Sequence, residues 1–122
     1  MRDLSAEQAN ILVNHFNHTS LQIGIYWNAS DAEASFFARK IGEALSNSKS
    51  KIAGFQPILS LGEEKHGLEV SGSDKATLEF SAKGLRAAGL DAVTTRVGGN
   101  GPATRIDIFV GYRPPPPLVI LK

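Results

Sequence analysis

Two stretches of the sequence share one order of patterns: an alternating apolar segment, a Ser-Asp pair and an apolar stripe at helical spacing. In the first, residues 21–27 (LQIGIYW) alternate and Ser30 and Asp31 precede the stripe. In the second, LEVSG precedes Ser73 and Asp74. Alternation is typical of strands, and Ser or Asp before a stripe of period 3.6 is typical of a helix N-terminus. The chain is therefore expected to contain two strand-helix units of similar build.

Further elements are expected before and after these units. SAEQANILVNHF carries Ser5 and Gln8 at the spacing of a capping box, which predicts an N-terminal helix. The segment after the second helix, 52–61, contains Pro57 and is expected to be an edge strand. Gly89 is placed to end the third helix, and the strands LDAVTTRV and RIDIFVG follow. The predicted order is an N-terminal helix and then β-α-β-β-α-β-β.

This order predicts an α/β chain of the α+β sandwich type. Our first choice is a ferredoxin-like split sandwich with an extra strand, because the short reversal between the second and third strands favours an antiparallel pair. A three-layer, doubly wound mixed sheet is the alternative, and the apolar IDIFV favours it since an edge strand is rarely so apolar. With 122 residues, 42% of them hydrophobic, we expect one domain over 1–113 and a Pro-rich apolar tail over 114–122.

Charge and composition limit the classes of partner. Thirteen basic and twelve acidic residues give a net charge of +1, which provides no long-range field to attract nucleic acid or an acidic membrane. The absence of cysteine excludes disulfides and thiolate metal sites. No apolar run approaches the roughly 18 residues of a membrane span, and the chain does not open like a signal peptide. We expect no cofactor, no nucleic-acid partner, and membrane contact only through an anchor outside this sequence.

The two polar bends are the candidates for ligand binding. A helix N-terminus attracts anions, so Asn28, Ser30 and Asp31 at the first bend, and Ser73 and Asp74 at the second, form one candidate set. The same side chains are suited to capping their own helices, and the aspartates would repel a phosphate, so we favour capping. A shared site would require both bends at one edge of the sheet, as in the doubly wound arrangement.

Other polar residues give weaker indications of chemistry. His15 and His18 could hold a metal, but we expect a solvent-facing pair; His66 lies in a charged turn and is expected to be solvated. No serine occupies a nucleophile elbow, and we assign no catalytic residue. Asp107 interrupts an apolar strand, so its side chain is expected to face the less buried side or to pair with Arg105 or Arg96.

Several motifs together resemble a known group of domains. RDLSAEQANILV, DAEASFFARKIGEAL, LRAAGLDA and IDIFVGYRP, within residues 2–114, resemble the domain of many small bacterial proteins of uncharacterised role, where it follows one N-terminal membrane helix and often a coiled coil. In element order alone, the chain is also similar to the C-terminal domain of LytR-type cell-wall attachment proteins. The resemblance implies a tethered domain and carries no site residues.

The lack of clustered titratable groups predicts a non-enzymatic binding or regulatory domain that contacts a protein partner or itself. The resemblance implies that this domain belongs to a membrane-tethered bacterial protein, which is membrane-associated in its full-length form. The alternative is a small anion or nucleotide sensor that uses the two helix N-termini. The expected contact surfaces are the first bend, the glycine loop and the start of the tail. They comprise Tyr26, Trp27, Gly98, Gly99, Asn100, Gly101, Arg113 and Pro114.

Overall fold

A computed structural model of the chain describes residues 2–59 and 65–114. The described chain folds in the predicted order of elements. They are α1 (Ala6–Phe16), β1 (Gln22–Asn28), α2 (Ala32–Ser46), β2 (Lys51–Ile58), β3 (Leu68–Gly72), α3 (Lys75–Ala87), β4 (Val93–Val97) and β5 (Arg105–Val110). The mixed α/β class and the α+β sandwich are thus confirmed. The predicted tail is described only as far as Pro114, and the rest of it lies outside the described residues.

The five strands form one sheet in the order β2-β1-β5-β3-β4. β1 is parallel to β2 and to β5, while β3 is parallel to β4 and antiparallel to β5. Each strand-helix-strand unit therefore has its two strands side by side, and β5 joins the two units. The split ferredoxin-like strand order was wrong, because there another strand would separate the two strands of each unit. Crossovers between adjacent parallel strands satisfy the same sequence pattern.

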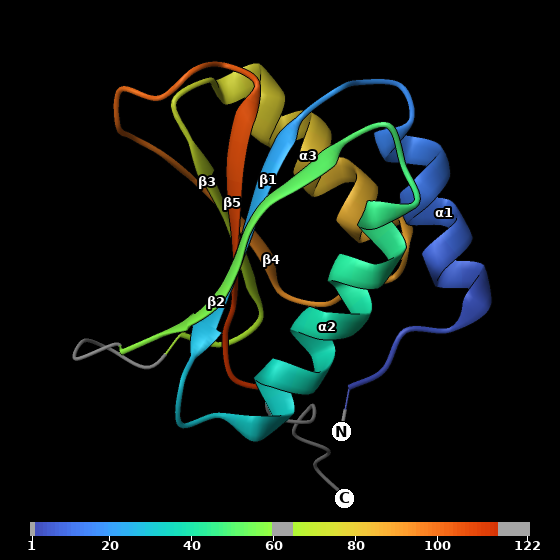
Figure 1. The fold of residues 1–122 in the computed structure, drawn as a ribbon, viewed down its shortest axis with the longest axis vertical. Helices are drawn as coiled ribbons and strands as arrows, with labels where there is room; N and C mark the ends of the chain where they lie inside the picture. Colours follow the sequence, from blue (N-terminus) through green and yellow to red (C-terminus); the bar gives the residue numbers. More distant parts are fainter. Residues whose placement is uncertain (1, 60–64, 115–122) are drawn as a thin grey trace, which may run out of the picture.

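All three helices lie on one side of the sheet (Figure 1). α2 packs on β1 and β2, α3 packs on β3 and β4, and α1 packs on both of these helices. The alternative three-layer arrangement, with helices on both faces, is therefore not found in the described residues. No helix among the described residues covers the opposite face of the sheet, which we call the open face.

The core lies between the sheet and the helices. Ile23 and Ile25 of β1 and Ile106 and Ile108 of β5 are fully buried against α2, α3 and α1 residues such as Phe16. β5 occupies the middle of the sheet, which explains why its sequence is so apolar. β2 lies at an edge, as Pro57 predicted.

The predicted helix ends are also found. Ser5 and Gln8 form the reciprocal capping box of α1. At the end of α3, Gly89 has φ +81°, and the Leu90 N–H donates to the Leu85 carbonyl at 3.1 Å, which closes the last turn.

Candidate binding site on the open face of the sheet

The open face is built by the alternation of β1 and β5. Ile106, Ile108 and Val110 point into the core, so Arg105, Asp107 and Phe109 are only partly buried on the other side. In β1 the same alternation places Tyr26 directly beside Phe109 in the neighbouring strand. Two aromatic side chains and a charged pair therefore share the centre of the open face.

These side chains surround a hollow of about 360 Å³. Its walls come from all five strands and from the segment that leads into β3. The lining residues are Tyr26, Ile58, Lys65, Glu69, Ser71, Arg96, Arg105, Asp107 and Phe109. We call this the open-face hollow.

Arg105 is held in the centre of the open-face hollow by two neighbours. Its Nη2 and Nε donate to Asp107 Oδ1 at 2.9 and 3.2 Å, and Nη2 also donates to the Tyr26 hydroxyl at 3.1 Å. The hydrogen bond that Arg105 donates to Asp107 raises the pKa of Arg105, against the effect of partial burial. The guanidinium is therefore a fixed positive charge of defined orientation.

Two glycines make room for this arrangement. A Cβ on Gly24 would come within 2.6 Å of the Tyr26 ring and 2.7 Å of Arg105 Nη2. A Cβ on Gly54, in the neighbouring strand β2, would lie 2.8 Å from the Tyr26 hydroxyl. Because neither residue has a side chain, the Tyr26 ring and the guanidinium can lie close to the backbone of the sheet.

A second charged group forms the rim of the open-face hollow. Glu69 is 3.3 Å from Lys65 Nζ and 3.9 Å from Arg96 Nε. With Arg105 and Asp107, the lining carries three cations and two carboxylates, which leaves one net positive charge. Arg96 is the least constrained cation, since its side chain is 69% exposed and its ion pair is long.

The predicted caps are found at both polar bends. Asp31 accepts from the Ala34 N–H and Asp74 from the Thr77 N–H, each at 3.0 Å. Hydrogen bonds from the Thr77 side chain and backbone lower the pKa of Asp74. Ser30 donates its N–H and hydroxyl to Asn28 Oδ1.

The structure does not bring the two bends together. β1 and β3 run in opposite directions because β5 is parallel to one and antiparallel to the other. Asn28, Ser30 and Asp31 thus lie at one end of the sheet, and Ser73 and Asp74 lie at the other. The Ser73 hydroxyl donates instead to the Gly101 carbonyl at 2.6 Å and holds the glycine loop.

The predicted contact residues have different environments. Tyr26 lines the open-face hollow, but Trp27 is only 7% exposed and packs on Phe55, with ring centroids 4.6 Å apart. Alternation turns Trp27 toward the helices, so its burial does not favour the contact role given to it. Gly98 to Gly101, including Asn100, form an exposed loop, and Arg113 is exposed while Pro114 is half-buried.

The expectation of a solvent-facing histidine pair was wrong for His15. Its ring stacks on Phe80 at a centroid distance of 4.1 Å, and Nε2 lies 2.6 Å from the Phe80 carbonyl oxygen. His15 therefore joins α1 to α3, while His18 and His66 are exposed. Within residues 2–59 and 65–114, no group of three His, Asp or Glu side chains is arranged to hold a metal.

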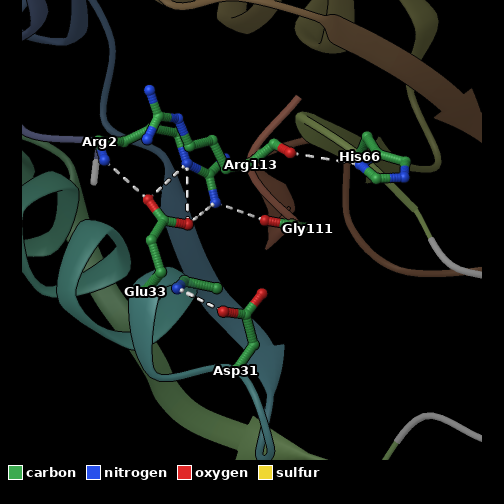
Figure 2. A network of polar contacts seen from close by, with 7 residues as sticks. Arg2, Asp31, Glu33, His66, Gly111 and Arg113 are labelled. Carbon is green, nitrogen blue, oxygen red and sulfur yellow. Dashed lines mark hydrogen bonds and ion pairs between the residues drawn. The ribbon is translucent and has the colours of Figure 1, made fainter. Parts of the chain in front are cut away.

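A polar contact between the start of the chain and α2 was not predicted from any sequence pattern (Figure 2). Arg2 Nη2 donates to Glu33 Oε1 and to the Gly111 carbonyl, both at 2.6 Å, and the guanidinium lies 4.8 Å from the Phe37 ring centroid. Burial would raise the pKa of Glu33, but the hydrogen bonds and charge of Arg2 lower it. This network joins Arg2, α2 and the end of β5.

Sequence reasoning identified only part of the open-face hollow. Asp107 was expected to face the less buried side or to pair with Arg105, and it does both. Phe109 was missed, although its place two residues after Asp107 puts it on the same face. Lys65, Ser71 and Glu69 come from another part of the chain, and only the strand order brings them here.

Comparisons with protein-family models, curated proteins and solved structures find no match to this chain. Among the described residues, none of the helices has the length and apolar character needed to cross a membrane.

Proposed function

We propose that this chain is a non-enzymatic interaction domain that binds a segment of a partner protein on the open face of its sheet. The main observation that supports this proposal is the open-face hollow, where Tyr26 of β1 lies together with Arg105 and Phe109 of β5. The helices pack against the other face of the sheet, where the side chains belong to the hydrophobic core. That face is therefore buried, whereas the open face is accessible to a partner. An open, partly apolar sheet face with a few oriented polar groups is suited to binding.

The contacts among the charged groups support binding rather than proton transfer. Asp107 accepts from Arg105, and Glu69 lies between Lys65 and Arg96. Each carboxylate thus serves as a counter-ion to a neighbouring cation. Such pairs position a guanidinium and an aromatic ring for recognition without providing a nucleophile beside a base.

The lining also indicates which segment would fit. Its single net positive charge favours one acidic group, which Arg96 can approach at the rim. Tyr26, Phe109 and Ile58 offer contacts to apolar or aromatic side chains. We therefore expect a segment with an acidic residue next to large apolar ones.

Selection from a library of random displayed peptides tests this proposal. Peptides that bind the full chain are expected to contain an acidic residue beside apolar ones. Arg105→Gln and Phe109→Ala should each weaken their binding by about tenfold or more, the effect of losing one oriented contact. Lys83→Ala, at an exposed position of α3, is the matched control and should have no effect. Peptides that bind all three variants equally well would contradict the proposal.

The membrane tether is proposed on the resemblance alone. Cells that express the natural gene product from its own locus can be separated into membrane and soluble fractions, with detection by an antibody against this domain. Recovery in the membrane fraction is expected. Recovery only in the soluble fraction would refute the tether and leave the binding proposal intact.

A further inference from the structure

β4 is an edge strand whose outer backbone groups are available for pairing. Its register with β3 places Val70 opposite Thr95, and the Gly98 N–H donates to the Gly72 carbonyl. In a parallel ladder, alternate residues direct their N–H and C=O toward the neighbour, so those of Thr95 and Val97 point outward. In the described part of the chain, no partner satisfies these outward groups.

The other edge strand of the sheet carries protective features that β4 lacks. β2 contains Pro57, which has no N–H, an irregularity in its register with β1 after Ile52, and the exposed Lys51 at its start. These are the features by which proteins prevent edge strands from pairing. β4 reads VTTRV, with a regular register, no proline and four β-branched residues.

The side chains of β4 add an apolar surface to this edge. Val97 is 55% exposed, and only Val93 of the five residues is buried. α3 packs on β4 but does not cover its second half. An edge strand with open backbone groups and an exposed valine is suited to accept another strand.

The sequence of β4 is complementary to itself in the antiparallel direction. A contact between two identical copies is closed by a twofold axis, which requires antiparallel edge pairing. Centred on Thr95, this register places Val93 opposite Val97 of the second copy and Thr94 opposite Arg96. Apolar residues thus meet each other, and no two like charges lie directly opposite. The outward groups of Thr95 pair with those of Thr95 in the second copy, and those of Val97 pair with Val93, whose carbonyl also accepts from Arg86 Nη2 at 2.8 Å.

We propose that two copies of this chain associate by antiparallel pairing of their β4 strands about a twofold axis at Thr95. The two sheets then continue into one another, with their open faces on the same side. Because Arg96 belongs both to β4 and to the rim of the open-face hollow, the two hollows adjoin the axis. This inference concerns an edge of the sheet and does not depend on what binds the open face.

Sedimentation velocity of the full chain over a range of concentrations tests the association. We expect a species of twice the 13.0 kDa chain mass that increases with concentration. Thr95→Pro removes an outward N–H and leaves the hydrogen bonds between β3 and β4 in place, so it should raise the dimer dissociation constant by about tenfold or more. Thr95→Val keeps the N–H and should keep the dimer.

Two further measurements test whether β4 pairs with the β4 strand of a second copy or with the end of the chain. Amide exchange at Thr95 and Val97 should slow as the protein concentration rises, whereas exchange at exposed amides of the helices should not. A chain that ends at Pro114 should dimerise like the full chain. The proposal would be overturned if the chain were a monomer at all concentrations. It would also be overturned if a folded Thr95→Pro variant dimerised as well as the wild type, or if removal of residues 115–122 abolished the dimer.

Discussion

Single contacts at the interfaces between elements decide how closely this domain packs. Gly84 of α3 faces the His15 ring of α1, and a Cβ on Gly84 would come within 2.6 Å of its Cγ. The His15 ring is in turn stacked on Phe80 of α3. The ring therefore has little room to move, and the absence of a side chain at Gly84 is a requirement of the interface rather than of the helix.

Gly84→Ala should accordingly have opposite effects in two backgrounds. In the wild type we expect destabilisation by about 1 to 3 kcal/mol, the usual cost of overpacking. In a His15→Ala background, the same change should stabilise by up to about 1 kcal/mol, because alanine favours a helix more than glycine does. Urea unfolding of the four proteins in this double-mutant cycle measures the coupling. Equal effects in both backgrounds would contradict it.

The ion pair of Arg2 and Glu33 should make stability depend on pH. The pKa of Glu33 is lowered in the folded state, so its contribution is present above the ordinary value of 4.5 and is lost as pH falls through the lower folded value. Glu33→Gln should therefore reduce the loss of stability in acid, while lowering stability near neutral pH by about 1 to 2 kcal/mol. Thermal unfolding from pH 7 to pH 3 measures both effects.

An exposed carboxylate of the same helix provides the control for this pH dependence. Glu43→Gln removes the same charge from α2 without touching the Arg2 network. The acid limb of its stability curve should remain close to that of the wild type. If both variants flatten the curve equally, net charge rather than the ion pair is responsible.

At the scale of elements, the caps account for where α2 and α3 begin. Asp31→Ala removes the acceptor for the Ala34 N–H and should destabilise the protein by about 1 kcal/mol, whereas Asp31→Asn should cost only a few tenths. Thermal or urea unfolding distinguishes the two. If Asp31 has a role beyond capping, such as holding a ligand, the asparagine variant would lose that role while keeping its stability.

Elements were predictable from the sequence because their signals are local. Alternation, cap residues and Gly89 act within a few positions, and they predicted every described helix and strand. The burial of His15 was missed because a single apolar stripe underestimates a helix that packs on two others, as α1 does. Helical spacing alone does not tell how many neighbours a helix has.

The strand order and most of the open-face hollow could not be predicted in this way. The two strands of a strand-helix-strand unit can lie side by side or be separated by another strand. Both arrangements have the same alternation and the same helix-covered face, so no local sequence pattern distinguishes them. Asp107 could be identified because it interrupts an apolar strand. Lys65 and Ser71 reach the same hollow only through the position of β3 beside β5.

For the whole molecule, β5 is the strand that unites the two halves. It pairs with β1 of the first unit and with β3 of the second. The two units are related in sequence pattern and run in opposite directions. Packing at β5 should therefore affect both halves together rather than one of them.

Ile108→Ala tests this role, since Ile108 is fully buried in β5. We expect a loss of about 2 to 5 kcal/mol, the range for a large buried aliphatic side chain. Unfolding followed by Trp27 fluorescence, which reports the first unit, should coincide with unfolding followed by amide resonances of α3. Leu59→Ala, where the side chain is 86% exposed, is the control and should change stability by less than about 0.5 kcal/mol. Separate transitions would mean that the halves fold independently.

The contact of Arg2 with the Gly111 carbonyl places the beginning and the end of the described chain next to each other (Figure 2). A short linker could thus connect residues 2 and 113 without crossing the sheet, and new termini could be opened in the exposed loop at Gly99. Such a circular permutant would retain the core and both faces of the sheet. It would also move any attached segment to the far end of β5, so the same domain could be presented in two opposite orientations from one support.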